Sequence, residues 1–261
     1  MADDPEPRSD GGLARWAPRI TPPIGLGLEL DDRQSLACAL RHLARVGFSE
    51  HIAGHITWRR DDGESMWVNP WGLWWQEVRA SDVCAVDYDG NVIEGAWDVT
   101  PAIHIHTELH KRREDARVVV HNHPYYTTLL AATGDLPEIV HQTGTMFDGD
   151  LRVVDEYTGE VDSAELGADL AGKIGGAAVT ILANHGVLVT GETIAQAVFR
   201  AACIDRVCRL AYDLMVLGKK PKPIAPEIRT AMKASLLERG AEVYWAGAVR
   251  LLLQQNPQVL T

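Results

Sequence analysis

The segment from Arg117 to Pro124 reads Arg-Val-Val-Val-His-Asn-His-Pro and is the most informative part of this 261-residue chain. Its run of valines predicts a buried strand that ends at the proline. Because side chains alternate along a strand, His121 and His123 leave the same face and can hold one metal ion. An isolated His-x-His pair can equally be two solvent-facing histidines in a turn. A third ligand is therefore needed to support a metal site.

A second apolar segment supplies the third candidate ligand. Residues 181–186 read Ile-Leu-Ala-Asn-His-Gly, so a buried strand delivers His185 into a glycine turn. If the two strands are adjacent and end at one rim of a sheet, His185 joins His121 and His123. Three imidazoles with an open coordination position are typical of a catalytic rather than a structural zinc-type centre.

Helix and strand signals alternate along the rest of the chain, which predicts the α/β class with a mixed sheet. Residues 1–26 are rich in Pro, Asp, Gly and Arg without apolar periodicity, so we expect a flexible amino-terminal arm before a single domain over 27–261. The expected helices cover 31–47, 100–113, 125–132, 163–174, 193–218 and 226–254, and the expected strands cover 55–58, 65–68, 83–86, 117–123 and 178–183.

Composition limits the classes of function. Lys and Arg number 25 against 36 Asp and Glu, a net charge of −11, which argues against a large nucleic-acid surface and favours a small-molecule substrate. We see no apolar run of membrane-spanning length and no secretory signal pattern. The four cysteines lack any CxxC spacing, so reduced thiols and a cytoplasmic location are expected.

Five motifs follow one another along the chain: Gly54-His55-Ile56-Thr57-Trp58-Arg59, Pro70-Trp71-Gly72, Asp89-Gly90, His121-Asn122-His123-Pro124 and Asn184-His185-Gly186. In this order they resemble the class II aldolase and adducin family, over roughly residues 28–216. The resemblance implies a three-layer α/β/α sandwich around a mostly antiparallel sheet. It also implies one divalent metal ion per subunit on His121, His123 and His185, and a homotetramer with active sites between subunits. Zinc is the expected ion, with manganese and iron as alternatives.

Departures from the family pattern make a phosphorylated sugar an unexpected substrate. Ala102 stands where the sugar-phosphate enzymes carry an acidic residue after two serines. His55 replaces the asparagine of the first phosphate loop. In the second phosphate loop, Trp71 stands where the family has a small hydroxyl residue, before Gly72. Both loops remain candidate substrate-binding segments.

Several other residues are candidates for the site. His104 lies near the lost acid and could be a base or a fourth ligand, or simply a surface residue. His106 matches a family histidine, and Tyr157 lies near the family's Tyr-x-Gly as a candidate proton donor. Arg59 could bind a substrate carboxylate or be structural. Trp71 belongs to a tryptophan-rich stretch, 67–75, that either packs in the core or forms an apolar wall for a flat substrate.

These features favour a metal-dependent lyase that breaks a carbon–carbon bond of a non-phosphorylated hydroxy or oxo acid, with an aromatic acid as one option. A Lewis acid would stabilise the enolate or phenolate formed by retro-aldol cleavage or decarboxylation, and both reactions stay open. A non-catalytic adducin-like binding domain is the alternative that Ala102 supports. A third alternative is oxygen chemistry at Fe(II), which three imidazoles can also hold.

Overall fold

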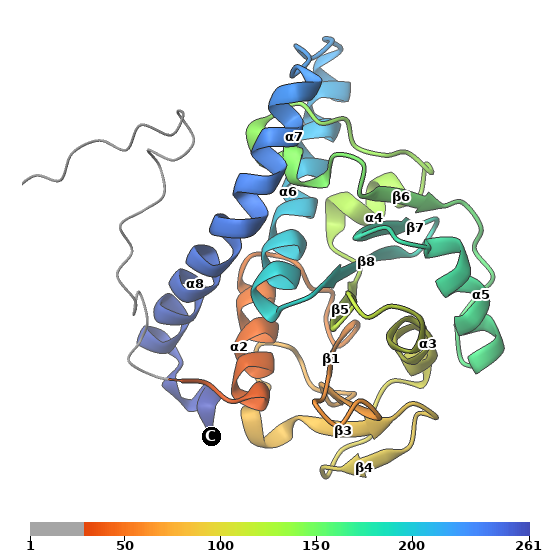
Figure 1. The fold of residues 1–261 in the computed structure, drawn as a ribbon, viewed down its shortest axis with the longest axis vertical. Coiled ribbons are helices and arrows are strands. Elements are labelled where there is room, and N and C mark those ends of the chain that lie inside the picture. Colours follow the sequence, from red (N-terminus) through yellow and green to blue (C-terminus); the bar gives the residue numbers. More distant parts are fainter. Residues whose placement is uncertain (1–28) are drawn as a thin grey trace, which may run out of the picture.

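A mixed sheet forms the middle layer of the computed structural model, which describes residues 29–261 (Figure 1). Within these residues the sheet has eight strands in the order β4-β3-β2-β1-β5-β8-β7-β6. All neighbours are antiparallel except β6 and β7, which confirms the predicted mixed, mostly antiparallel sheet. The strands are β1 (His55–Arg59), β2 (Ser65–Val68), β3 (Cys84–Asp87), β4 (Val92–Glu94), β5 (Val118–Asn122), β6 (Leu151–Val154), β7 (Val179–Leu182) and β8 (Gly186–Gly191).

Helices cover both faces of the sheet, which confirms the predicted three-layer sandwich (Figure 1). One face carries α2 (Asp32–Arg45), α4 (Tyr125–Ala131), α6 (Ile194–Leu217) and α8 (Ala241–Gln255). The other face carries α3 (His104–Arg112) and α5 (Ala164–Ile174), and α7 (Pro226–Ser235) leads into α8. Short helical turns span Ala80–Asp82, Pro101–Ile103, Gln142–Phe147 and Pro257–Leu260, and a π-helical turn, Leu236–Gly240, joins α7 to α8. The proposed arm, residues 1–26, lies outside the described residues.

Alternation along β5 assigns its side chains to the two layers of core. Val118 and Val120 pack in the large apolar cluster beneath α2, α6 and α8. Val119 packs with Ile105 and Leu109 of α3 on the opposite face. His121 leaves the strand on the same face as Val119, because residues two apart share a face. The histidine pair is therefore placed on the side of the sheet that α3 covers.

The two histidine-bearing strands are not neighbours, which corrects the arrangement expected from the sequence. β8 lies between β5 and β7 and pairs with both. The reason is a tight turn in which Asn184 takes a left-handed backbone conformation, φ 54°, and the amide of His185 donates to the carbonyl of Leu182. The chain reverses there at once and continues as β8, so His185 lies in a hairpin turn between two strands.

Two glycines let three backbone segments meet at the end of β5. Gly54 has a φ of +85°, and a Cβ there would lie 2.2 Å from Nδ2 of Asn122. A Cβ on Gly186 would lie 2.6 Å from the carbonyl oxygen of Asn122 and 2.6 Å from Cδ2 of His123. Any side chain at either position would push the loop before β1, or the β7–β8 turn, away from the histidines.

The four cysteines, Cys38, Cys84, Cys203 and Cys208, are all buried and unpaired, in agreement with reduced core thiols. Burial raises the pKa of Cys203 and of Cys208 to about 12, so both remain protonated at neutral pH. Neither Cys203 nor Cys208 is therefore available as a thiolate ligand or as a nucleophile.

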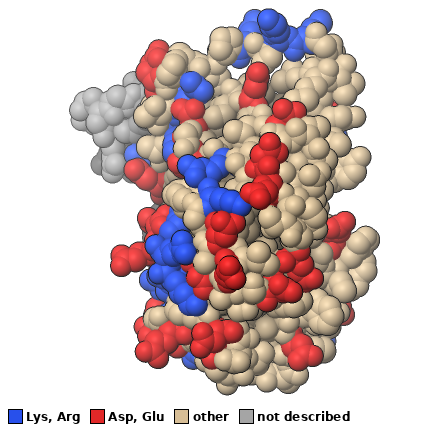
Figure 2. Space-filling view, turned by 90° about the vertical axis from the view of Figure 1, so that its right-hand side faces the viewer, with Lys and Arg blue, Asp and Glu red and all other residues tan. Residues whose placement is uncertain are grey.

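Charge of both signs is interspersed on the face that carries α3 and α5 (Figure 2). On α5, Lys173 lies 2.7 Å from Asp169 and 2.6 Å from Glu156. Over residues 29–261 the helices are all too short or too polar to cross a lipid bilayer.

We predict that Gly54→Ala destabilises the protein by about 3 kcal/mol, because it adds a left-handed residue penalty and an overpacked contact. Gly63→Ala is the matched control. Gly63 has a φ of +73° with open space around its missing Cβ, so only the backbone penalty of about 1 kcal/mol applies. Urea unfolding of both variants measures the difference, and equal losses would contradict the close approach to Asn122.

Candidate metal centre

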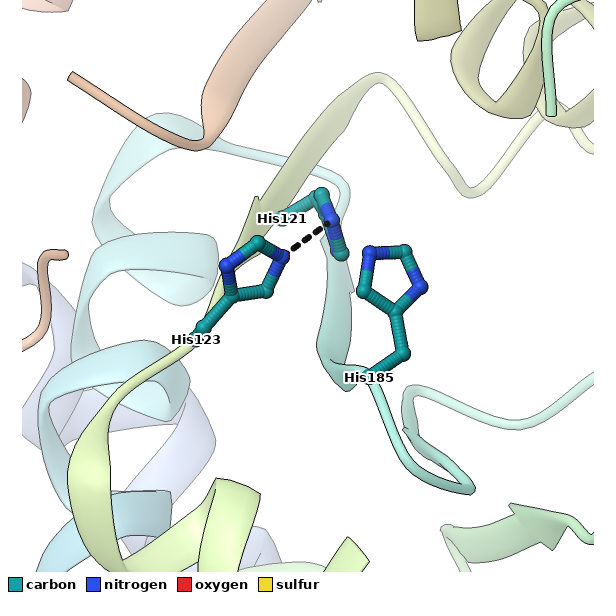
Figure 3. A group of neighbouring side chains, drawn as sticks. All are labelled: His121, His123 and His185. Carbon is teal, nitrogen blue, oxygen red and sulfur yellow. Dashed lines mark hydrogen bonds between the residues drawn. The ribbon is translucent and has the colours of Figure 1, made fainter. Parts of the chain in front are cut away.

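Three histidine rings converge beside the end of β5 (Figure 3). His121 is on β5, His123 follows it, and His185 comes from the β7–β8 turn. One donor nitrogen from each ring lies within 4.8 Å of the other two. The ring centroids are 4.7–5.0 Å apart. The structure thus brings together all three residues that the sequence indicated as ligands.

Hydrogen bonds at the back of two rings fix which nitrogens face the centre. His123 Nδ1 lies 2.7 Å from Oε2 of Glu50, and His121 Nδ1 lies 3.0 Å from the carbonyl oxygen of Val187. Both oxygens can only accept, so in the neutral rings Nδ1 carries the proton and Nε2 carries the lone pair. A carboxylate or carbonyl behind a histidine is the usual support of a metal ligand.

The two Nε2 atoms of His121 and His123 lie 3.3 Å apart, the contact dashed in Figure 3. When both rings are neutral and donate through Nδ1, two lone pairs face each other at this distance without a proton between them. A cation removes that conflict. Nitrogens bound tetrahedrally at about 2.0–2.1 Å from zinc are themselves about 3.3–3.4 Å apart, so the donor set fits a divalent ion.

Burial keeps the rings of His121 and His185 in the neutral form that metal binding needs. It holds the pKa of His121 well below the usual value, and the neighbouring His55 and His185 add to the effect. Burial, with His123 nearby, lowers the pKa of His185 to about 4. Neutral imidazoles bind a cation without first losing a proton at physiological pH.

Asn122 holds the loop that carries Glu50 against the end of β5. Its side-chain oxygen accepts from the backbone amides of Glu50, at 3.0 Å, and His123, at 2.7 Å. Its side-chain nitrogen donates to the carbonyl oxygen of Ala53 at 3.1 Å. Asn122 is fully buried, so these bonds are shielded from water. Neither Glu50 nor this role of Asn122 was predicted, because both depend on contacts between segments about 70 residues apart.

The histidines lie in the wall of a cavity of about 420 Å³. Among the described residues its lining contains no Lys or Arg, and Glu160 is its only carboxylate. The lining residues are Ile52, Ala53, Gly54, His55, Trp71, Thr100, Pro101, Ala102, His121, His123, Tyr157, Gly159, Glu160, Val161 and His185. A site of this composition is poorly suited to hold a phosphate through direct charge pairing.

Four of the other residues singled out in the sequence lie in or directly behind this cavity. His55 lines it, and His106 stands behind His55 with 2.6 Å between their ring nitrogens. Trp71 and Tyr157 line it from more exposed positions, and the Tyr157 ring is 6.1 Å from that of His185. Ala102 also lines it, so the wall carries a methyl group where the acid of the sugar-phosphate enzymes was expected.

The remaining three predicted residues are, like His106, not part of the cavity lining. Arg59, at the far end of β1, donates to the backbone carbonyls of His110 and, at 2.8 Å, Arg113. These bonds tie β1 to the end of α3, which is a structural arrangement. His104 lies beside Gly90 at the tip of the β3–β4 hairpin. Gly72 permits the left-handed turn, φ +89°, that follows Trp71.

The four tryptophans of residues 67–75 have different roles: three pack against other side chains or the backbone, and one lines the cavity. Trp75 is fully buried and donates to the carbonyl oxygen of Gly54 at 3.2 Å. The guanidinium groups of Arg33 and Arg60 both pack on the Trp67 ring. Trp74 packs edge-on against His51. Trp71 alone among these four lines the cavity.

The structure is an α/β/α sandwich (Figure 1) with a three-histidine cluster that could hold a metal ion, and comparisons identify its family. The model of the Class II Aldolase and Adducin N-terminal domain matches residues 34–212. The chain therefore belongs to the class II aldolase and adducin family, which confirms the resemblance stated from the motifs.

Individual relatives carry more specific names. The chain is 32% identical over 197 residues to the decarboxylase NovR of Streptomyces niveus, covering 74% of this chain and 72% of that protein. It is also 32% identical over 197 residues to 4-hydroxy-3-prenylphenylpyruvate oxygenase/4-hydroxy-3-prenylbenzoate synthase of Streptomyces roseochromogenus subsp. oscitans, covering 74% and 70%. The solved L-fuculose 1-phosphate aldolase of Glaciozyma antarctica PI12 aligns with a TM-score of 0.78 at 25% identity, over 88% of this chain and 91% of that one.

We predict that Glu50→Gln weakens zinc binding by about 10–100-fold, because the amide removes the negative charge that supports His123. Glu64→Gln is the control, since Glu64 is exposed in the β1–β2 turn. Competition with a chromogenic chelator measures both affinities. Unchanged affinity in Glu50→Gln would show that the carboxylate does not support the ligand.

We predict that the metal-free protein loses stability as the pH falls from about 6.5 toward 4. Burial lowers the pKa of His42 and His185 to about 4, and that of His55 and His110 to about 3. The unfolded chain takes up these protons near pH 6.5 while the folded chain does not. Each group therefore lowers the free energy of unfolding by up to about 1.4 kcal/mol per pH unit over this window.

Urea unfolding between pH 7 and pH 4.5 tests this dependence, with His110→Gln as the comparison. The variant lacks one titrating imidazole, so its free energy of unfolding should fall less steeply with pH than that of the wild type. Equal slopes would show that His110 is not held neutral in the folded protein.

Proposed function

We propose that this protein is a metal-dependent lyase that breaks a carbon–carbon bond of a small, non-phosphorylated hydroxy or oxo acid. The observation that carries the proposal is a three-histidine cluster in the wall of a cavity that residues 29–261 line without any Lys or Arg. Similarity to a protein named as a decarboxylase supports decarboxylation of an aromatic hydroxy acid as the first reaction to test, with retro-aldol cleavage as the other branch.

His121, His123 and His185 would hold one divalent ion, with zinc expected before manganese or iron. When bound, the ion supplies a Lewis acid for the charge that develops on a substrate oxygen. The protein residues around it bind and orient the substrate. The exposed indole of Trp71 offers a flat apolar wall, and His55 offers a polar contact deeper in the cavity.

Protonation of the carbanion left by bond cleavage needs a donor within the cavity. Tyr157 and Glu160 both line it, on the irregular segment between β6 and α5. We assign the proton to Tyr157, whose ring is next to that of His185, with Glu160 as its alternative. His106 acts through His55, which it contacts, and we propose it as a positioning residue.

We further propose that the active form is a cytoplasmic homotetramer with active sites between subunits. Trp71 is 54% exposed and Tyr157 is 57% exposed although both line the cavity. Large aromatic side chains at the mouth of a cavity are suited to contact with a second subunit. A neighbouring subunit could then supply the positive charge that the lining lacks.

A second candidate reaction is oxygenation at Fe(II), favoured by the similarity to a protein named as an oxygenase. Three neutral imidazoles can hold iron as well as zinc, so the ligand types do not separate the two. A non-catalytic, adducin-like binding domain is the third. The intact histidine cluster argues against a binding domain. Such a domain has no need of a contact in which the Nε2 lone pairs of His121 and His123 face each other.

We predict that metal-loaded protein releases carbon dioxide from at least one hydroxylated aromatic carboxylate, and that His121→Ala lowers turnover more than about 100-fold through loss of the ion. His42→Gln, a histidine of α2 on the opposite face of the sheet, is the control and should keep activity. Zinc-, manganese- and anaerobically prepared Fe(II)-protein are each assayed with and without oxygen, and the retro-aldol branch is assayed through aldehyde release.

The assay separates the candidates. Turnover without oxygen supports the lyase. Turnover only with Fe(II) and oxygen supports the oxygenase. Absence of turnover with all three metals, over a panel that includes aromatic and aliphatic hydroxy acids, would favour the binding domain.

A further inference from the structure

The connection between α6 and α7 forms one end of the molecule along its longest axis, at the top of Figure 1. Basic side chains gather at the same end in Figure 2. We call residues 214–225 the tip, and they read Leu-Met-Val-Leu-Gly-Lys-Lys-Pro-Lys-Pro-Ile-Ala. The tip holds three lysines, five large aliphatic residues and no acidic residue, in a chain whose net charge is −11. The proposed function makes no use of this end of the molecule.

The last turn of α6 exposes three consecutive apolar side chains. Met215 is 55% exposed, Val216 70% and Leu217 60%. Successive residues of an α-helix are turned by about 100°, so these three side chains point in directions that span about 200°. A flat protein surface would cover only one of these directions. A fluid acyl layer closes around the end of a helix and covers all three.

Three lysines follow directly and are free to bind an anion. Lys219, Lys220 and Lys222 are exposed, and within residues 29–261 none of them forms an ion pair or a hydrogen bond. The carboxyl end of a helix attracts cations through its dipole, but this effect is confined to the last turn and does not explain the apolar side chains beside the lysines. Charge pairing within the described chain therefore does not account for the cluster.

A hollow of about 270 Å³ lies beside the last turn of α6. Val140 and Met215 are in its wall, and Lys219 and Lys220 line it as well. Among the described residues that line it, Glu138 carries the only carboxylate. Ammonium groups beside an apolar hollow complement a ligand that is anionic at one end and apolar at the other, as an acidic phospholipid is.

We propose that the tip binds the surface of a membrane that contains acidic phospholipids, with Met215, Val216 and Leu217 at the boundary of the acyl layer and the three lysines among the phosphates. Binding of this kind combines burial of apolar side chains with attraction to anionic lipid. The net charge of −11 does not prevent it, because at physiological salt charges more than about 8 Å from the contact are screened.

The contact is shallow. Residues 219–224 form no backbone hydrogen bond with the described part of the chain, and Pro221 and Pro223 have no N–H to donate. Unpaired backbone groups cannot enter the hydrocarbon layer, but water and lipid phosphates can pair with them at the level of the headgroups. The tip therefore lies on a membrane surface and does not cross it.

The test is sedimentation of the full chain with sucrose-loaded vesicles, made either of phosphatidylcholine alone or of equal parts of phosphatidylcholine and phosphatidylserine. We expect binding to the mixed vesicles only, and weaker binding as the salt concentration rises. Lys219→Gln, Lys220→Gln and Lys222→Gln together should weaken binding about 100-fold, since each lysine near an anionic surface contributes about fivefold. Unchanged binding in this triple variant would overturn the proposal.

A second triple variant is the matched control. Arg117→Gln, Lys173→Gln and Arg209→Gln change the net charge by the same amount at partly exposed positions outside the tip. This control should bind the mixed vesicles as the wild type does. Equal weakening in the two triple variants would contradict the proposal, because the attraction would then come from the overall charge of the protein.

The apolar part of the contact has its own test. Val216→Ser with Leu217→Ser should weaken binding to the mixed vesicles by about tenfold or more, because less apolar surface is buried. Both side chains are exposed, so urea unfolding of this variant should match that of the wild type. Unchanged vesicle binding in a folded Val216→Ser, Leu217→Ser variant would overturn the acyl contact.

Other occupants of the tip give different results. If the tip is an interface between copies of this chain, the Val216→Ser, Leu217→Ser variant elutes as a smaller assembly than the wild type in gel filtration, and the wild type ignores vesicles. If the partner is an acidic protein, polyglutamate binds and vesicles do not. Either result, or no binding to any vesicle at low salt, overturns the proposal. None of these measurements needs turnover, so the inference stands or falls independently of the lyase.

Discussion

The pairing of β5 with β1 on one side and β8 on the other is the constraint on which the site depends. The register places His121 opposite His55 on β1 and opposite Leu188 on β8. A slip of one residue in either pair would turn His121 to the apolar face that packs beneath α6. The three valines of β5 would tolerate such a slip, because both faces of the strand are apolar. The cost comes from the polar end of the strand, since a slip would break the three hydrogen bonds of the buried Asn122 side chain.

The three histidines of the cluster could be predicted from the sequence because each lies in a local pattern. His121 and His123 follow an apolar strand directly, and His185 sits in a glycine turn. The outer contacts could not be predicted, because Glu50 reaches His123 only after the loop before β1 docks on Asn122. Hydrophobic periodicity carries no information about such docking.

The same distinction explains the errors in the fold. The sandwich and the mixed sheet follow from alternating helix and strand signals. The strand β8 was not predicted, because its six residues begin and end with glycine and start directly after the turn that carries His185. The role of Arg59 stayed open for a related reason. A strand arginine faces either a ligand or a helix end, and only the position of α3 shows which.

The cavity is built from two kinds of segment. Its histidines come from paired strands and from a hairpin turn whose ends are hydrogen-bonded into the sheet, so their positions are as rigid as the sheet itself. Tyr157 and Glu160 instead come from an irregular connection between β6 and α5. Selection can therefore exchange this connection and change what the cavity accepts while the half that carries the three histidines is inherited unchanged. The protein is modular at the level of one loop, and a library confined to residues 156–160 would vary the cavity wall while keeping Val161, which packs in the core with α3 and α5.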